Sequence, residues 1–302
     1  MLLRFWKQLK TWRKISFGPV AVIFRLDRAV HVTPNSSRRA CSTRSTSAAQ
    51  AVNADSESMA LRGMLDRPQR IALVVGVGPG FGYALAHRLA DQGLLVVLAS
   101  RNATRLDPLV DQIRSQGGKA CAYGCDATME KSVQELFALV EAQHGVPDLV
   151  VYSVQSFGPG ETMDIELPAF EDSWKHNCLG AFLVARAAGR AMLPRAEGAI
   201  LLVGSTSSLL GRAGHLNLAV GKFGQRALAQ VLARELWPKG IHVAHIVIDA
   251  DIDEGDGDHD GQSQSDPNHI AQVVIDVYRQ PKTAWSSEVD VRPWNERFWE
   301  HC

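Results

Sequence analysis

Short apolar runs alternate with longer amphipathic segments along the chain from Arg70 onward. Six of the runs have the length and nearly continuous apolar character of buried strands, and they lie at 71–77, 94–100, 119–125, 148–154, 199–205 and 241–248. Between them, apolar residues recur at helical spacing, as in 81–92, 129–143, 172–193 and 217–238. Strands that are apolar on both faces indicate a parallel sheet with helices on both sides.

This alternation predicts the fold class. Parallel strands joined by right-handed helical crossovers give an α/β fold, a Rossmann-type doubly wound parallel sheet in three layers. Residues 68–302 contain neither an internal repeat nor a linker. We therefore expect a single domain and place its bounds at 65–302.

Charge separates the start of the chain from this domain. Residues 1–54 hold ten Lys and Arg but one acid, Asp27, whereas the whole chain has 32 basic and 32 acidic residues. An acid-poor start rich in Ser and Arg is typical of an organellar transit peptide. We interpret 1–64 as a transit peptide and linker and expect a mitochondrial or plastid protein. A plain disordered extension of a cytoplasmic protein is the alternative.

Composition also excludes several classes of protein. Without residues 1–54, the chain keeps 22 basic against 31 acidic residues, and so acidic a body is a poor general binder of nucleic acid. The longest uncharged run near the start, Ile15–Phe24, is too short to cross a membrane. The five cysteines are scattered and odd in number, so we expect neither a disulfide framework nor a metal site.

A glycine cluster directly follows the first predicted strand. It reads Gly76-Val-Gly-Pro-Gly80-Phe81-Gly82 and opens the next predicted helix. Glycine permits a tight turn and lets the backbone approach a pyrophosphate, whose charge is stabilised at a helix N-terminus. The spacing differs from G-x-G-x-x-G, and an ordinary tight turn is the alternative. Its place between a first strand and a helix favours a dinucleotide site.

With this cluster the chain resembles the short-chain dehydrogenase/reductase (SDR) family over about residues 68–250. Three further segments carry the resemblance: Ser100-Arg101 at the end of the second strand, Asp126-Ala127 after the third, and Asn177-Cys-Leu-Gly180. It implies an oxidoreductase that acts on a small-molecule carbonyl or alcohol, and a possible homo-oligomer. The residues that it implies for the cofactor are Gly76, Gly80, Phe81, Gly82, Ser100, Arg101, Asp126, Ala127 and Lys222.

Arg101 changes the cofactor that we expect. Family members that prefer NAD usually have an acid near this position for the ribose hydroxyls, and here that acid is absent. A guanidinium can instead pair with the 2′-phosphate of NADP through its planar fork. We therefore expect NADP(H) in preference to NAD(H), and a solvated surface charge is the alternative reading of Arg101.

The catalytic segment departs from the family pattern. The family uses Ser, Tyr and Lys, with Tyr-x-x-x-Lys on the helix after the fifth strand. Here Lys222 aligns with that lysine and Ser205 with the serine, but Leu218 stands where the tyrosine is expected. The resemblance thus implies Asn177, Ser205 and Lys222 as catalytic residues and leaves the proton donor open.

Several groups could donate the proton in place of the missing tyrosine. Tyr152 ends the fourth predicted strand, and His215 lies three residues before Leu218. Water held by Ser205 and Asn177, or a proton relayed from Lys222, is a further option. Tyr278-Arg-Gln-Pro-Lys282 also spells Tyr-x-x-x-Lys, but Pro281 breaks the helical turn. We treat that match as coincidence.

Two functions from different classes therefore stay open. One is an NADP(H)-dependent oxidoreductase with an atypical active site. The other is a catalytically impaired NADP(H)-binding protein that senses the cofactor or scaffolds a partner.

The segments after the sixth strand also differ from the family. Asp249-Ala250 replaces its Pro-Gly, and residues 249–260 hold seven acids including Asp249, a segment that we interpret as a solvated substrate loop. The tail carries aromatic residues that could line a substrate pocket or close the sheet edge. These are Trp285, Trp294, Phe298 and Trp299.

Overall fold

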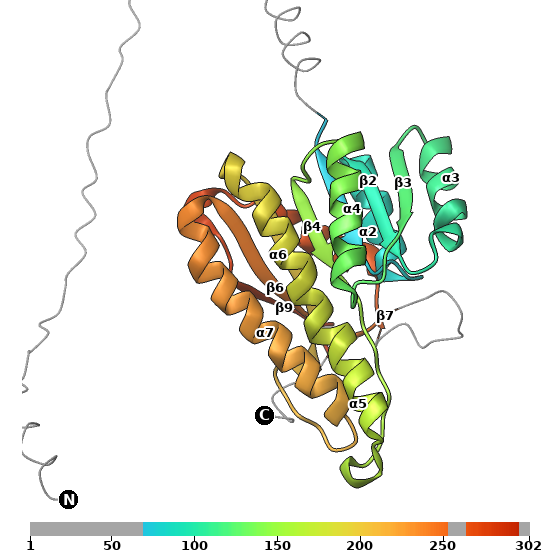
Figure 1. Cartoon of the computed structure of the whole chain (residues 1–302), viewed down its shortest axis with the longest axis vertical. Coiled ribbons are helices and arrows are strands. Elements are labelled where there is room, and N and C mark those ends of the chain that lie inside the picture. Colours follow the sequence, from blue (N-terminus) through green and yellow to red (C-terminus); the bar gives the residue numbers. More distant parts are fainter. Residues whose placement is uncertain (1–68, 253–263, 296–302) are drawn as a thin grey trace, which may run out of the picture. The chain divides into compact units, whose positions relative to one another are not determined.

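The computed structural model describes residues 69–252 and 264–295. A seven-stranded, all-parallel sheet has the order β3-β2-β1-β4-β5-β6-β9 (Figure 1). Its strands are β1 (Ile71–Val75), β2 (Leu95–Ser100), β3 (Lys119–Gly124), β4 (Leu149–Tyr152), β5 (Gly198–Ser205), β6 (Ile241–Ile248) and β9 (Glu288–Val291). A separate short pair joins β7 (Asp251–Ile252) to β8 (Gln264–Ser265).

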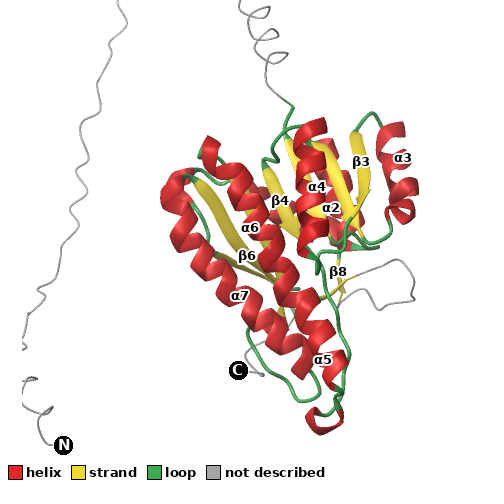
Figure 2. Ribbon diagram, in the orientation of Figure 1, coloured by secondary structure: helices red, strands yellow, loops and turns green. Residues whose placement is uncertain are grey.

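Helices cover both faces of this sheet (Figure 2). One face packs against α2 (Phe81–Asp91), α3 (Asp107–Ser115) and α8 (Pro267–Tyr278), the other against α4 (Glu130–Gln143), α6 (Gly180–Met192) and α7 (Leu216–Leu236). Helix α5 (Leu167–Trp174) leads through a π-helical turn, η3 (Lys175–Leu179), into α6. Short 3-10 turns are η1 (Ala103–Leu106), η2 (Thr162–Asp164), η4 (Leu193–Arg195), η5 (Thr206–Ser208), η6 (Trp237–Lys239) and η7 (Lys282–Ala284).

The alternation of side chains explains why the strands need both layers. In β1, Ala72 and Val74 pack on the α2 side, whereas Ile71, Leu73 and Val75 pack on the α4 side. All five are buried, so each face of the strand removes apolar surface from water. The predicted doubly wound, three-layer fold is confirmed.

Some elements differ from the prediction. β1 ends at Val75 because Gly76, with φ at 91°, turns the chain away from the sheet. The helix expected over 172–193 is divided by the π-helical turn, a feature that often marks functional sites. β9 was not predicted, because two of its four residues are acids. The predicted transit peptide and most of the acidic loop lie outside the described residues.

The sheet order determines where a ligand can bind. From β1 the chain continues to β2 on one side, and β4 lies on the other. Ligands of open α/β sheets bind outside the carboxyl ends of the strands at such a switch point. Within the described ranges, no helix has the length and apolar character to cross a membrane.

Candidate active site

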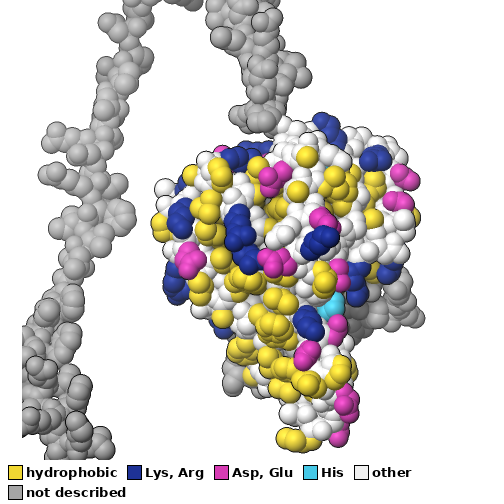
Figure 3. All heavy atoms as spheres, in the orientation of Figure 1, with side chains coloured by type: hydrophobic (Ala, Val, Ile, Leu, Met, Phe, Trp, Pro, Cys, Tyr) yellow, Lys and Arg dark blue, Asp and Glu magenta, His cyan; other side chains and the backbone are white. Residues whose placement is uncertain are grey.

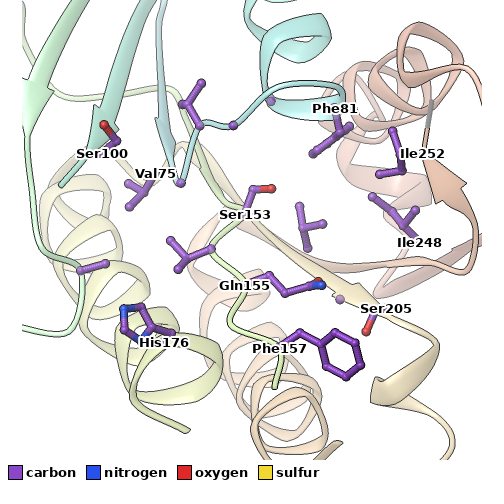
Figure 4. A pocket seen from close by; sticks show the side chains of 18 of the residues that line it. Val75, Phe81, Ser100, Ser153, Gln155, Phe157, His176, Ser205, Ile248 and Ile252 are labelled. Carbon is purple, nitrogen blue, oxygen red and sulfur yellow. The ribbon is translucent and has the colours of Figure 1, made fainter. Parts of the chain in front are cut away.

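A cavity of about 1210 Å³ opens at the carboxyl ends of the central strands. Figure 4 shows Ser100 toward one end of it and Phe157 and Ser205 toward the other. Eight of the nine residues predicted for the cofactor line this cavity: Gly76, Phe81, Gly82, Ser100, Arg101, Asp126, Ala127 and Lys222. The ninth, Gly80, is the N-cap of α2 and does not line the cavity itself.

The glycine loop has the shape that a phosphate group needs. A Cβ on Gly76 would lie 2.6 Å from the backbone nitrogen of Val154, so a larger residue would collide with the segment after β4. Gly78 faces open space, with no atom within 4 Å of its Cβ position. Gly80 has φ at 69°, and no side chain caps the start of α2. The first amides of this helix therefore have no side-chain acceptor, which suits an anionic ligand.

Basic and acidic groups meet at the β2–β3 end of the cavity. Arg101 lines it together with Arg105 from η1, a residue that was not predicted from the sequence. Burial raises the pKa of Asp126, but hydrogen bonds from the backbone N–H and hydroxyl of Thr128 lower it more, and the charge of Arg101 adds to this. Asp126 is thus held as a carboxylate, and two guanidinium groups are available for a phosphate.

Lys222 is a buried amine in the cavity wall. Its side chain is 1% exposed, and Nζ donates a hydrogen bond to the carbonyl oxygen of Val203 at 2.9 Å. Burial lowers its pKa from 10.5 to about 7. An amine in this state changes its protonation near neutral pH, so it can hold or release a proton there.

Leu218 and Ser205 line the cavity together with Lys222, whose Nζ binds the carbonyl oxygen of Val203, two residues before Ser205. Leu218 is 6% exposed and lies on α7 four residues before Lys222, so both side chains share one face of the helix. Ser205 ends β5, and its backbone N–H donates to the hydroxyl of Ser208 at 3.1 Å. The predicted serine and lysine therefore line one cavity, and an apolar side chain lies one helical turn before the lysine.

Asn177 has a different position from Ser205 and Lys222. It is fully buried in the π-helical turn and does not line the cavity. Its amide nitrogen donates to the carbonyl oxygens of Ser156 at 2.7 Å and Ser173 at 2.9 Å, and its amide oxygen accepts from the N–H of Ser156 at 3.3 Å. The side chain thus fixes the segment after β4 to the helix, and its direct part in catalysis stays a prediction.

Tyr152 does not face the cavity. Its hydroxyl donates a short hydrogen bond to the carbonyl oxygen of His176, and burial raises its pKa. A Cβ on Gly180 would lie 2.3 Å from that hydroxyl, which explains why glycine ends the Asn177–Gly180 motif. Among the residues that line the cavity, Tyr83 is the one tyrosine, and it belongs to the glycine-loop end.

Two loops form one wall of the cavity. Gly160 donates its N–H to the carbonyl oxygen of Gly214 at 3.0 Å, which joins the segment after β4 to the segment before α7. On this wall the rings of Phe157 and His215 stack at 5.1 Å with 15° between their planes. Both line the cavity, and Arg212 lines it beside them. His215 thus lies where a proton donor could act, whereas Phe157 and Arg212 were not expected from the sequence.

Asp249, which together with Ala250 replaces the family's Pro-Gly, is buried and hydrogen-bonded. It accepts short hydrogen bonds from the hydroxyl of Thr206 and from Arg292, and its N–H donates to the carbonyl oxygen of Val291 at 3.0 Å. It therefore ties the turn after β5 to the end of β9. Trp285 packs against His242 with ring centroids 4.8 Å apart and, like Trp294, does not line the cavity.

The comparison with known sequences is consistent with the fold and the cavity described above. The family described as short chain dehydrogenase matches residues 70–250, and the chain belongs to this family. An uncharacterized oxidoreductase of Staphylococcus aureus (strain N315) is 28% identical over 227 residues, which are 74% of this chain and 97% of that protein. Sorbitol-6-phosphate 2-dehydrogenase of Escherichia coli (strain K12) is 32% identical over 59% of this chain and 70% of its own length.

Among solved structures, too, the chain is similar to short-chain oxidoreductases. A short-chain dehydrogenase from Rhodopseudomonas palustris is 32% identical, with a TM-score of 0.67, covering 74% of this chain and 99% of that one. A metagenomic short-chain oxidoreductase in complex with NADP is 25% identical, with a TM-score of 0.66, covering 75% and 98%. The chain is thus similar over its domain to complete short-chain oxidoreductases.

Proposed function

We propose that this protein is an NADP(H)-dependent oxidoreductase that interconverts a carbonyl and an alcohol. One observation carries the proposal: a single cavity is lined by the glycine loop, by Arg101 and by the pair Ser205 and Lys222. One continuous space thus offers groups that could bind the pyrophosphate, bind the 2′-phosphate and transfer a proton.

The preference for NADP(H) rests on the two arginines beside Ser100. Arg101 and Arg105 line the cavity where β2 ends, and no acid occupies the position that would bind ribose hydroxyls. Charge-assisted hydrogen bonds to a phosphate are stronger than neutral ones. The NADP complex of the similar metagenomic oxidoreductase is consistent with this choice.

Lys222 is the proton carrier that we propose in place of tyrosine. A bound nicotinamide supplies or accepts the hydride, and the chain must then provide or remove one proton at the substrate oxygen. Lys222 lines the cavity and has a pKa near 7, so its ammonium form is available to donate and its amine form to accept. Ser205 can hydrogen-bond the same oxygen.

A second function is favoured by one specific residue. Leu218 has no proton to give, and it occupies the place of the family's acid within a buried wall. A protein that binds NADP(H) and performs no turnover, acting as a sensor or scaffold, is consistent with this substitution. Turnover of carbonyls and alcohols with NADPH and NADP distinguishes the two functions.

The cofactor assignment is tested by Arg101→Ala. We expect affinity for NADPH to fall about tenfold or more, because a charge-assisted contact is lost, while affinity for NADH changes little. Isothermal titration calorimetry with both nucleotides measures this, with Arg190→Ala on α6 as a control outside the cavity. Equal losses for both nucleotides would remove Arg101 from the 2′-phosphate site.

A further inference from the structure

Two polar side chains that line the cavity have no hydrogen-bond partner. Ser205 Oγ is buried and unpartnered, and the side chain of Gln155 makes no hydrogen bond to any residue that the structure describes. Both residues line the cavity. In Figure 4 the side chain of Gln155 points toward Ser205. Polar groups that face a cavity without partners are available to a ligand.

The sheet explains why these two residues meet. β4 pairs with β5, and Tyr152, the last residue of β4, lies opposite Leu202. Gln155 and Ser205 each follow three residues later, beyond the part of the sheet where β4 and β5 pair. Parallel neighbours present their carboxyl ends at the same edge of a sheet. Both side chains are therefore delivered to the edge where the cavity opens.

The backbone is fixed on both sides of Gln155. The N–H of Ser153 donates to the carbonyl oxygen of Val75 at 2.8 Å, which continues the contact with β1 beyond the end of β4. On the other side, Asn177 accepts from the N–H of Ser156 at 3.3 Å and donates to its carbonyl oxygen at 2.7 Å. The carboxamide of Gln155 is thus presented by a backbone that is held at two points.

No acid of the cavity binds the amide hydrogens of Gln155. Among the described residues that line the cavity, the acids are Asp126 and Asp249. Asp126 accepts hydrogen bonds from Thr128, and Asp249 accepts one from Thr206. A ligand oxygen can therefore accept a hydrogen bond from the carboxamide without displacing a protein group.

A carboxamide can supply part of what the missing tyrosine would supply. The side-chain nitrogen of Gln155 carries two hydrogens and donates hydrogen bonds, but it does not release a proton at neutral pH. Donors fixed in advance stabilise the negative charge that develops on a carbonyl oxygen during reduction. Leu218 offers no such donor, whereas Gln155 and Ser205 offer one each.

We propose that Gln155 is a catalytic residue, whose side-chain N–H donates a hydrogen bond to the substrate oxygen beside the hydroxyl of Ser205. This inference rests on the proposed function of the same cavity. Gln155 takes no part in the transfer of hydride or proton, and the proton still comes from Lys222. The stacked rings of Phe157 and His215, which also line the cavity, favour an aromatic or other planar group next to the carbonyl.

The hydrogen bond is tested without turnover, with the chromophore 4-dimethylaminocinnamaldehyde, which absorbs at longer wavelength when its carbonyl oxygen accepts hydrogen bonds. It is added to the protein saturated with NADP⁺, which has no hydride to give. We expect a shift to longer wavelength in the wild type and loss of about half of it or more in Gln155→Leu and in Ser205→Ala. Gln112→Leu on α3, outside the cavity, is the control and should keep the full shift.

Two results of this titration would overturn the proposal: no shift in the wild type, or the full shift in Gln155→Leu. Gln155 is exposed, so its substitution leaves the core intact. Binding of NADPH, measured by calorimetry, should be unchanged in Gln155→Leu. If its affinity for NADPH falls while the shift of the aldehyde stays complete, Gln155 binds the cofactor and not the substrate oxygen.

A near-isosteric variant separates hydrogen-bond donation from the filling of space. Gln155→Glu keeps the size of the side chain, but an ionised carboxylate cannot donate and repels the developing charge. With the best carbonyl substrate of a panel, we expect kcat relative to the wild type to fall about a hundredfold at about pH 8, with a smaller change in KM. The ratio should recover toward about pH 5, where protonation gives the carboxyl group a hydrogen to donate. An active Gln155→Glu variant with the wild-type kcat at the higher pH would contradict the proposal.

The two proposals fail in different ways. If no carbonyl or alcohol is converted, the oxidoreductase function fails, while the spectrum of the bound aldehyde still decides whether Gln155 donates to a carbonyl oxygen. If the wild type turns over but Gln155→Leu keeps both the full shift and the full kcat, the assignment of Gln155 alone fails.

Discussion

Leu218→Tyr is the most informative single change, because it restores a phenol four residues before Lys222. Leu218 lines a cavity of about 1210 Å³, so the added ring and hydroxyl can enter open space. The ammonium form of Lys222 would lie on the same helix face and lower the pKa of the new phenol. Tyrosine would then donate to a substrate oxygen that Ser205 also reaches.

The expected increase in reaction rate follows from what a positioned general acid contributes to catalysis. General acid catalysis contributes typically about 10²–10⁴-fold, so we expect the variant to reduce carbonyls with NADPH at least about a hundredfold faster than the wild type. If Lys222 already supplies part of this effect, the gain lies at the lower end of the range. Enlarging a packed residue costs about 1–3 kcal/mol, so the free energy of unfolding is measured in parallel.

The assay is NADPH oxidation with a panel of aldehydes and ketones. Leu218→Phe is the matched control, because it adds the ring without the hydroxyl and should gain nothing. Combining Leu218→Tyr with Lys222→Met should abolish the gain, since the phenol loses its ammonium neighbour. A folded Leu218→Tyr variant that binds NADPH but is no faster than Leu218→Phe would refute the reasoning.

Three further predictions concern stability, processing and assembly. Lys222→Met should raise the free energy of unfolding by up to about 4 kcal/mol at pH 7, where burial opposes the ammonium form. This gain should vanish as the pH rises through 7 to about 10.5, and urea unfolding at both pH values measures it. We expect the native protein to begin downstream of residue 40 and to lie in an organelle; an intact Met1 in cytosolic material would contradict this. Figure 3 shows hydrophobic side chains over α5, α6 and α7, and Phe182 on α6 and Phe223 on α7 are exposed. We propose that this surface joins copies of the chain in a homo-oligomer. Light scattering should then give a lower mass for Phe223→Asp than for the wild type.

Local patterns account for the parts of the fold that could be predicted. The strands β1, β2, β4, β5 and β6 are almost completely buried and β3 is partly buried, and their apolar runs are visible without any tertiary information. β9 could not be recognised in this way, because it carries Glu288 and Asp290 and, among the described strands, pairs with β6 alone. Its stability comes from one strand neighbour and from ion pairs, which leave no periodic signal.

Local patterns also decide which residues of the site could be predicted from the sequence. The glycine loop and Lys222 were predicted because each belongs to a short motif with fixed spacing. Arg105, Phe157 and Arg212 were missed, because they reach the cavity only through the folding of turns around it. In the same way, His245 lies within a strand that was predicted from its apolar neighbours, and its partner Glu288 is 43 residues further along the chain.

These contacts give the last described strand a part in the site. Glu288 at its start holds His245 from behind the cavity wall, and Arg292, just after its end, holds Asp249. Asp249 in turn binds Thr206, the residue that follows Ser205. Asp249 therefore fixes the turn after β5, and Glu288 fixes β6 to α7; each carboxylate is paired with an arginine. We propose that the contact of Asp249 with Thr206 helps to hold Ser205 in the cavity that Lys222 also lines, so that a proton could still be moved there although leucine stands at the position of the family's tyrosine.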